Sequence, residues 1–347
     1  MNKILLGLSG GTDSAVAAAI LKEKGFEVIG CFLMMTENSH ESSPDALAAL
    51  SVAEHLGISL VMRDVGDIFK EKVSDYFIRE YLSGRTPNPC VMCNPNVKIH
   101  SLLNTADEMG IEMIATGHYA LTGYSEKYGG TVLKASPSKK DQSYFLGMLT
   151  PKQTERLVFP LGEFNSKQEI REYAKRLSLP NAEKPDSLEI CFIPDNDYGK
   201  YICEKGNYTP CEGNFLDNEG RIIGRHSGII NYTVGQRKGL GAFGEPRYVK
   251  HINAGDNTVT LCKKDERYEM SLEAESLSYA VRVHPEKSFI GRVKIRSTAK
   301  AQEGVITVTG DTFRVDFKEA VLAPTPGQTA VIYDSDDTVI GAGVIIR

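Results

Sequence analysis

The 347-residue sequence lacks an excess of positive charge, because 40 Lys and Arg face 45 Asp and Glu and leave a net charge of −5. A surface that binds nucleic acid or an anionic membrane must therefore be local. The sequence also lacks low-complexity tracts and repeats of fixed period. Its 41% hydrophobic and 24% charged residues are ordinary for a folded protein, which excludes a fibre or a wholly disordered chain.

Long hydrophobic runs are also missing. The first residues, MNKILLGLSGGTDS, contain one Lys and an apolar run that stops at glycines, too short for a signal peptide or a membrane-spanning helix. Seven cysteines are an odd number and too sparse for a disulfide framework. We therefore expect a cytoplasmic protein that does not associate with membranes, and cysteines that serve chemistry or the core.

The first part of the chain alternates between apolar runs and helical patterns. The apolar runs occupy residues 3–8, 26–33, 59–64 and 113–116, and the helical patterns occupy 14–24, 45–56, 67–82, 97–108, 150–158 and 166–177. This β-α-β alternation predicts an α/β domain with an open parallel sheet and right-handed crossovers. Ligands of such a sheet bind at the carboxyl ends of its strands.

Beyond about residue 208 the sequence pattern changes to short runs in which apolar and polar residues alternate and which are bounded by glycine. These runs are GRIIGRH, GIINYTVG, RYVKHINAG, NTVTLCK, FIGRVKIR, GVITVTG, TFRVDF, TAVIYD and VIGAGVIIR. They predict one small β-rich module and then a barrel or sandwich. We expect domain boundaries of 1–205, 206–270 and 271–347.

A glycine-rich loop follows the first apolar run, with the sequence Ser9-Gly10-Gly11-Thr12-Asp13-Ser14. Backbone N–H groups at such a strand-to-helix turn bind anions, and glycine lets a ligand approach the backbone closely. A lone Ser-Gly-Gly is also typical of a simple turn with a capping hydroxyl. The loop matches neither the Walker nor the dinucleotide pattern. The full string resembles the PP-loop ATP pyrophosphatases, which cleave ATP between its α and β phosphates.

Three cysteines stand in patterns of chemical interest. Cys90 and Cys93 lie in TPNPCVMCN, where two prolines stiffen a loop that leads into a helix. We expect Cys93 to lie near the start of that helix, where the local field lowers a thiol pKa below about 8.5. Cys191 lies in the apolar stretch SLEICFIP, and by itself it would be interpreted as a buried core thiol.

Several sites could use the Cys90-x-x-Cys93 pair. A zinc site needs two further ligands, usually from a second pair of closely spaced cysteines. Cys203 and Cys211 are too far apart in sequence to form such a pair. A thioredoxin-type dithiol expects a different context, without a phosphate loop. An iron–sulfur cluster held by Cys90, Cys93 and Cys191, with a fourth position open, is the serious alternative, although we do not favour it.

Seven strings together resemble the tRNA-specific 2-thiouridylases, from residue 7 to residue 343. They are GLSGGTDS, GRTPNPCVMCN, ATGHYA, KKDQSYFL, KPDSLEICFIPD, HSGIINYTVGQRKGLG and TPGQ. The resemblance implies a PP-loop domain, a small central domain and a C-terminal β-barrel. It also implies tRNA as substrate, ATP with Mg as co-substrate, and a sulfur donor protein, either a cysteine desulfurase or a relay protein. No resident metal is expected.

The chemistry implied by the resemblance is replacement of the 2-oxygen of a wobble uridine by sulfur. That oxygen is a poor leaving group, so ATP adenylates it, and pyrophosphate leaves into the cradle formed by Gly10 and Gly11. The cysteine matching Cys191 carries a persulfide. The one matching Cys93 is the nucleophile that resolves the sulfur linkage, so a disulfide bond is expected in the cycle.

The resemblance assigns three sets of binding residues, position by position. ATP would contact Gly7, Leu8, Ser9, Gly10, Gly11, Thr12, Asp13, Ser14, Leu33 and Gly117. The target base, which must leave its stack to be reached, would be held by Asn88, Pro89 and Cys90. The rest of the tRNA would contact His118, Lys140, Asp141, Gln142, Arg296, Ser297 and Gln328.

One position departs from the family pattern. Many family members carry an aspartate with an acid/base role where this chain has Cys90, and a thiol has a much higher reference pKa. Water or another group could take over that role, a persulfide could pass through Cys90, or the three cysteines could hold a cluster. A non-catalytic tRNA-binding paralogue is the competing function. An adenylating ligase for a small metabolite would leave TPNPC and GQRKGLG without a purpose.

Two segments of the second half of the chain are locally basic. Residues 221–250 and residues 282–300 each contain six Lys or Arg and a single acidic residue. Alternating charge of this kind is also typical of solvated strands. Contacts with backbone phosphates would position an anticodon arm here without reading its sequence, and binding would then be sensitive to salt.

Overall fold

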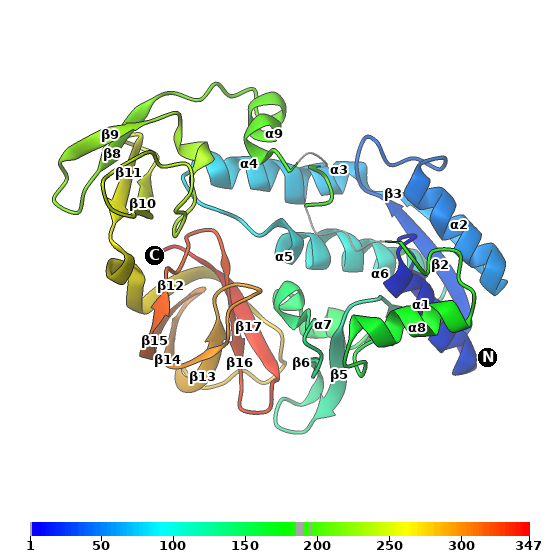
Figure 1. Cartoon of the computed structure of the whole chain (residues 1–347). Coiled ribbons are helices and arrows are strands. Elements are labelled where there is room, and N and C mark those ends of the chain that lie inside the picture. Colours follow the sequence, from blue (N-terminus) through cyan, green and yellow to red (C-terminus); the bar gives the residue numbers. More distant parts are fainter. Residues whose placement is uncertain (1, 185–189, 194–195) are drawn as a thin grey trace.

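The computed structural model describes residues 2–184, 190–193 and 196–347. A parallel sheet with its helices is followed by a small four-stranded sheet and a closed barrel (Figure 1). This order confirms the predicted fold class. Residues 185–189 and 194–195 of the KPDSLEICFIPD string lie outside the described part of the chain.

The N-terminal sheet has five strands in the order β3-β2-β1-β4-β7, and every pair is parallel. Its order reverses at the central β1, so the carboxyl ends of β1 and β4 form the crevice in which ligands of such sheets bind. The strands are β1 (Lys3–Gly7), β2 (Glu27–Met34), β3 (Ser59–Asp64), β4 (Met113–Ala115) and β7 (Leu157–Val158).

Alternate residues of β1 face opposite layers of helices. Ile4 and Leu6 belong to a core shared with α1 (Thr12–Glu23), α2 (Pro44–Leu56) and α8 (Lys167–Arg176). Leu5 belongs to a second core that includes α6 (Ile99–Glu108). Helices therefore cover both faces of the sheet, which explains why its strands are apolar on both sides.

Two predicted helices are interrupted by π-turns. Residues 67–82 form α3 (Gly66–Phe69), η1 (Lys70–Ser74) and α4 (Asp75–Leu82). The cysteine loop leads into α5 (Pro89–Cys93), η2 (Asn94–Lys98) and α6 without a break. Hydrophobic periodicity carries no signal for the one-residue insertion that a π-turn represents.

Some local predictions are wrong. The helix predicted over 150–158 is shorter, because α7 (Pro151–Thr154) ends early and β7 pairs with β4. The hairpin β5 (Ala120–Ser125) and β6 (Gly130–Ala135), the turn η3 (Ser143–Leu146) and the helix α9 (Tyr198–Lys205) were not expected from the sequence pattern.

The small sheet has the order β10-β11-β8-β9. GIINYTVG was predicted as a strand, but it forms the short turn η4 (Ile229–Asn231) because Ile229 and Ile230 pack into the core beside α4 rather than into a ladder. The strands are β8 (Gly213–Leu216), β9 (Ile222–His226), β10 (Tyr248–Asn253) and β11 (Thr258–Cys262).

The turn η5 (Lys264–Arg267) leads into an antiparallel barrel that closes in the order β12-β15-β14-β13-β16-β17. The strand β12 begins at Tyr268, three residues before the expected boundary at 271. The barrel strands are β12 (Tyr268–Tyr279), β13 (Ser288–Lys294), β14 (Gln302–Thr309), β15 (Thr312–Leu322), β16 (Thr329–Tyr333) and β17 (Val339–Ile345). No helix among the described residues is both long and apolar enough to cross a bilayer.

Candidate active site

The glycine-rich loop joins β1 to the N-terminus of α1. Gly10 has a φ of +73°, and a Cβ there would overlap the carbonyl oxygen of Asp45 on α2, so only glycine fits. The Ser14 hydroxyl donates to the carbonyl of Gly11 at 3.0 Å and accepts from the N–H of Ser9 at 3.2 Å. The loop is therefore pre-shaped around the positive end of a twelve-residue helix.

Basic and phenolic side chains hold the loop from outside. The Asp13 carboxylate accepts from Lys167 Nζ at 2.6 Å and from the Tyr119 hydroxyl at 2.8 Å. The Gly10 carbonyl accepts from Asn181 Nδ2 at 3.1 Å and from Lys184 Nζ at 3.3 Å. Two lysines thus stand beside the anion cradle, and each is paired with a carboxylate, Lys167 with Asp13 and Lys184 with Asp45.

The other residues expected to contact ATP lie around this crevice. A Cβ on Gly117, which follows β4, would lie 3.0 Å from the amide nitrogen of Ser14. Gly7 is the last residue of β1 and pairs with Cys31 of the neighbouring β2. Leu33 lies two residues further along β2. Thr12 is buried, and its hydroxyl donates to the carbonyl of Asn181 at 2.7 Å. The structure therefore brings the set together at one sheet edge.

The cysteine loop caps its own helix. Asn88 is the N-cap of α5, and its Oδ1 accepts the N–H of Cys90 at 3.2 Å, while Pro89 occupies the first turn. Cys93 is the last residue of α5, not its first, so the expected help from a helix N-terminus is absent. The prediction of a lowered Cys93 pKa is wrong, because burial raises the pKa of this thiol to about 11.

Three thiols act on one another electrostatically. Burial is the largest cause that raises the pKa of Cys90 and of Cys93, and the charge of Cys191 raises both further. Cys93 is 4% exposed, whereas Cys90 and Cys191 have exposed surface. Cys191, nearly a hundred residues away in sequence, therefore belongs to the same site, and all three thiols are free.

Lys98 links these thiols to the phosphate side of the site. Its positive charge lowers the pKa of Cys90 and of Cys93 against the effect of burial. Burial lowers the pKa of His118 to about 3, and Lys98 contributes in the same direction. His118 directly follows Gly117, which lies against Ser14 at the helix end. The phosphate loop and the thiols therefore form two halves of one site.

The surroundings of the three cysteines are as follows. Across the described ranges, no three His, Cys, Asp or Glu side chains are arranged to hold a metal ion. Cys90, Cys93 and Cys191 are among the residues covered, and their common neighbour is the cation Lys98.

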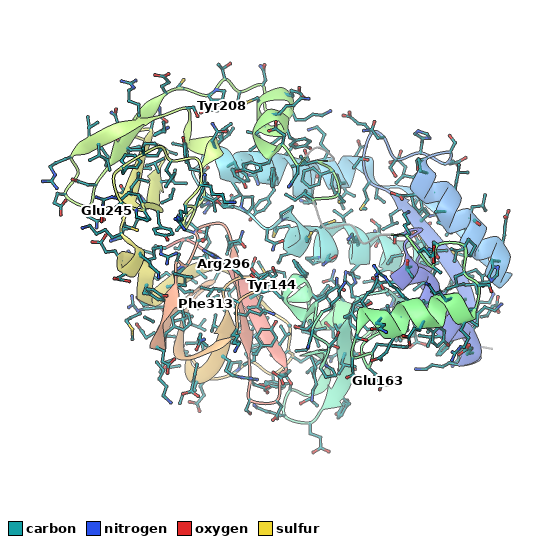
Figure 2. The ribbon with its side chains drawn as sticks, in the orientation of Figure 1. Tyr144, Glu163, Tyr208, Glu245, Arg296 and Phe313 are labelled. Carbon is teal, nitrogen blue, oxygen red and sulfur yellow. The ribbon has the colours of Figure 1, made fainter. Side chains whose placement is uncertain are left out.

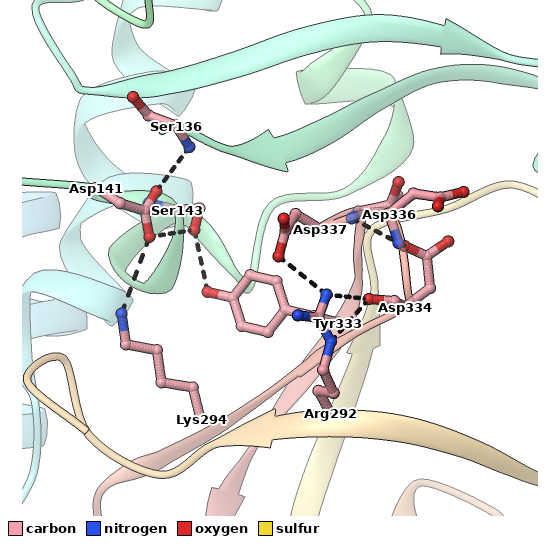
Figure 3. A network of polar contacts seen from close by, with 10 residues as sticks. Ser136, Asp141, Ser143, Arg292, Lys294, Tyr333, Asp334, Asp336 and Asp337 are labelled. Atoms are coloured by element: carbon pink, nitrogen blue, oxygen red, sulfur yellow. Dashed lines mark hydrogen bonds and ion pairs between the residues drawn. The ribbon is translucent and has the colours of Figure 1, made fainter. Parts of the chain in front are cut away.

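Several residues expected to contact tRNA have protein partners here. Asp141 accepts from the N–H of Ser136 and of Ser143 and lies 3.8 Å from Lys294 of the barrel (Figure 3). Gln142 Oε1 accepts from the N–H of Tyr119 at 3.0 Å. His118 makes a 2.8 Å hydrogen bond with the Thr116 hydroxyl and packs edge-on against Phe159. Lys140 is exposed at the surface.

The barrel contributes its own predicted residues. Gln328 Nε2 donates to the carbonyl of Thr86 at 2.8 Å, at the start of the cysteine loop. Arg296 donates to the Ala323 carbonyl and to the Thr325 hydroxyl, and it lies near Tyr144 where the barrel meets the helices (Figure 2). Ser297 is partly buried one residue further along.

Sequence patterns missed Lys98, Lys167 and Asn181. Lys98 stands five residues after Cys93, a spacing that does not mark one face of an α-helix, and nothing near Lys167 in sequence points to the loop. Tyr119 and Lys184 could have been found, because they lie inside the strings ATGHYA and KPDSLEICFIPD.

Comparison with known proteins gives consistent matches along the whole chain. Family models match residues 2–195 as a tRNA methyl transferase HUP domain, residues 200–263 as a tRNA methyl transferase PRC-barrel domain and residues 269–345 as an aminomethyltransferase beta-barrel domain. A 4-thiouridine synthetase–RNA complex with bound ATP covers 53% of this chain and 43% of its own, at 19% identity and a TM-score of 0.36, too low to support an inference.

Curated relatives match at full length. tRNA-specific 2-thiouridylase MnmA 2 of Caldanaerobacter subterraneus subsp. tengcongensis is 45% identical over 359 residues, covering 100% of this chain and 98% of that protein. tRNA-specific 2-thiouridylase MnmA of Acetivibrio thermocellus is 45% identical over 356 residues, covering 99% of each. With three consecutive family models and full-length relatives at this identity, the chain belongs to the tRNA-specific 2-thiouridylase family.

Proposed function

We propose that this chain is a tRNA-uridine 2-sulfurtransferase that uses ATP to replace the 2-oxygen of a wobble uridine by sulfur. One observation carries the proposal: the phosphate loop and the three thiols belong to a single site, joined through Lys98 and His118. The full-length relatives named tRNA-specific 2-thiouridylases support the substrate class. The chain is accordingly an enzyme with ATP as its co-substrate.

In the first step the uracil 2-oxygen attacks the α-phosphorus of ATP, and pyrophosphate leaves. The amides at the start of α1 would stabilise the departing negative charge, and Lys167 and Lys184, which are paired with Asp13 and Asp45, lie beside them. Magnesium would arrive with ATP and be held mainly by phosphate oxygens, as is usual for this ion. Asp13 is the carboxylate within the loop, and its Oδ1 already accepts from Lys167 and Tyr119.

In the second step the terminal sulfur of a Cys191 persulfide attacks C2, and AMP leaves with the oxygen. The Cys93 thiolate then attacks Sγ of Cys191, which breaks the bond to the transferred sulfur and releases 2-thiouridine. A Cys93–Cys191 disulfide remains, and a dithiol reductant with a fresh sulfur donor restores the enzyme. The exposure of Cys191 supports its role as carrier, because a donor protein can reach it, whereas Cys93 is buried.

The tRNA would lie across the β-rich half of the molecule. Half of the cations of the two basic segments pair with carboxylates, for example Arg282 with Glu155 and Arg247 with Glu245. Within the described residues the other half form no ion pair. Arg296 among them donates to the Ala323 carbonyl and the Thr325 hydroxyl, which leaves five cations available for phosphates. They are Arg237, Lys238, Lys250, Lys287 and Lys300. We place the reaction in the cytoplasm, where tRNA and a cysteine desulfurase or relay protein meet.

The proposal is tested with unmodified tRNA, ATP, Mg²⁺ and a cysteine desulfurase with cysteine. The wild-type protein is expected to form 2-thiouridine, detected by nucleoside mass spectrometry, and to release pyrophosphate. Cys191→Ser is expected to abolish 2-thiouridine. Cys211→Ser, which alters another exposed thiol, is the matched control and should retain full activity.

The outcomes separate the alternatives. Binding of tRNA without release of pyrophosphate would identify a non-catalytic paralogue. Full activity in Cys191→Ser would remove this cysteine from the mechanism. An iron count on anaerobically purified protein decides the remaining alternative, because activity that depends on stoichiometric iron would replace the persulfide route with a cluster.

A further inference from the structure

The proposed reaction leaves one charged group at its centre unused. Lys98 is the last residue of the π-turn η2, and Cys93 immediately precedes that turn. Cys90 lies one helical turn earlier on α5. Five positions separate Lys98 from Cys93, a spacing that would not place the two side chains on one face of a regular α-helix.

The π-turn has a local cause in the sequence. Pro95 has no N–H to bond the carbonyl of Val91, and its ring crowds that carbonyl, so a regular α-helix cannot continue here. The chain widens instead, and the N–H of Ile99 bonds the carbonyl of Asn94, five residues back.

The carbonyls released by the π-turn find other partners. The Met92 carbonyl accepts from Asn96 Nδ2 at 2.9 Å, and the Pro95 carbonyl accepts from Gln153 Nε2 at 2.7 Å. Side-chain amides thereby replace the missing helical hydrogen bonds and hold the turn in this form. The π-turn is therefore a defined structural feature and not a frayed helix end.

The turn decides which residue shares a face with the thiol. Residues four apart stack along an α-helix, whereas residues five apart stack across a π-turn. A regular helix would have set Val97 above Cys93. The π-turn sets Lys98 there, five residues after Cys93, and its charge interacts with Cys93, Cys90 and Cys191.

The charges around Lys98 are unusual for a lysine. Burial lowers its pKa, but Cys93, Cys90 and Cys191 raise it, and the net pKa lies above the usual value. In the described part of the chain no carboxylate forms an ion pair with Lys98. The other titratable groups on elements packed against η2 do not contribute to this shift; they are Asp67 of α3, Tyr144 of η3, and His100, Asp107 and Glu108 of α6.

We propose that Lys98 is a positioning residue for the sulfur chemistry, whose ammonium group stabilises the anionic sulfur of Cys93 and of the Cys191 persulfide. The need for such a cation follows from burial. With a pKa near 11, only about one Cys93 thiol in 10⁴ is ionised at pH 7. Any loss of the neighbouring positive charge would reduce that fraction further. The use of the anion in tRNA thiolation rests on the proposed function, whereas the charge effect does not.

The test measures thiol reactivity without ATP or tRNA. Iodoacetamide reacts with the thiolate, so its rate of reaction at Cys93, located by tandem mass spectrometry of the peptide, reports ionisation between pH 7 and pH 11. Lys98→Met is expected to slow alkylation about tenfold at pH 8 and to move the profile about one pH unit upward, the usual minimum effect of a lost opposite charge. Lys98→Arg should stay within about threefold of wild type, and the exposed Lys264→Met should not differ from it.

Pro95→Ala is a second variant that keeps the lysine and removes the cause of the π-turn. It should slow Cys93 alkylation in the same direction, with Lys98 intact, and it carries the test if Lys98→Met does not fold. A wild-type profile in folded Lys98→Met would overturn the proposal. If the profiles shift as expected but wild-type protein makes no 2-thiouridine, the charge assignment stands and the proposed function fails.

Discussion

At the scale of single residues, burial decides how the site's titratable groups behave. Cys93 and His118 both lie in surroundings that disfavour their charged forms, which raises the pKa of the thiol and lowers that of the imidazole. Burial lowers the pKa of Lys98, but the negative charge of the three cysteines in their anionic form raises it above its usual value. At neutral pH the Cys93 thiol, with a pKa of about 11, is mostly protonated.

A pH dependence of stability follows for His118. Its pKa of about 3 in the folded protein lies below the unfolded value near 6.5. The unfolded state therefore binds more protons between these values, and stability is lost as pH falls from 6.5 toward 3, by at most about 1.4 kcal/mol per pH unit. His118→Gln is expected to flatten this loss in urea unfolding at pH 7, 5.5 and 4.5. The exposed His251→Gln is the control, and equal acid sensitivity in His118→Gln and wild type would contradict the prediction.

At the scale of elements, two short segments shape the site. The shape of the glycine-rich loop depends on the backbone conformation of Gly10, which has a positive φ and lies close to α2. The α5–η2 segment is determined by Pro95, which turns an α-helix into a π-turn and changes the face on which Lys98 lies.

Gly10→Ala tests the loop. Its methyl group would overlap the Asp45 carbonyl, and its positive φ strains any residue but glycine, so we expect a loss of about 2 kcal/mol in the free energy of unfolding. Release of pyrophosphate should fall at least about tenfold, because the amides move away from the phosphates.

Gly25→Ala is the matched control for this variant. Gly25 also has a positive φ, of +84°, but nothing lies within 4 Å of a Cβ there. It should cost about 1 kcal/mol of stability and leave pyrophosphate release unchanged. Equal rates of release in both variants would show that the loop shape does not matter for the nucleotide.

At the scale of the whole molecule, the cysteine loop is held by the barrel. Arg85 bridges the buried Glu80 of α4, at 2.6 Å, and Glu275 of β12, at 2.9 Å. The next residue, Thr86, donates its N–H to the Pro326 carbonyl and accepts from Gln328. The barrel therefore positions the loop that carries Asn88 and Cys90.

Arg85→Met tests this connection. It leaves the Glu80 carboxylate, only 3% exposed, without its cation, so the free energy of unfolding should fall by about 3 kcal/mol in urea titrations. The double variant with Glu80→Gln should recover part of that loss, because the uncompensated charge is gone. If the double variant is no more stable than Arg85→Met, the penalty does not come from the stranded carboxylate.

Much of the architecture could be predicted from local patterns. The strand at 59–64 and the helix at 45–56 agree with β3 and α2 to within one residue, because each spans one uninterrupted periodic run. The strand β12 was missed, since only two of its twelve residues are buried and bulges near Glu269 and Glu275 break its alternation. The strand β7 was missed because two residues pair only once β4 is in place.

The sequence by itself determined the family, the fold class and the anion-binding loop, because glycines, prolines and hydrophobic periods act through local backbone preferences and short spacings. Only the tertiary structure decided that Cys191 joins Cys90 and Cys93, that Lys98 lies among them and that burial keeps Cys93 protonated. These features depend on the distances and the dielectric surroundings of groups far apart along the chain, which no local pattern encodes.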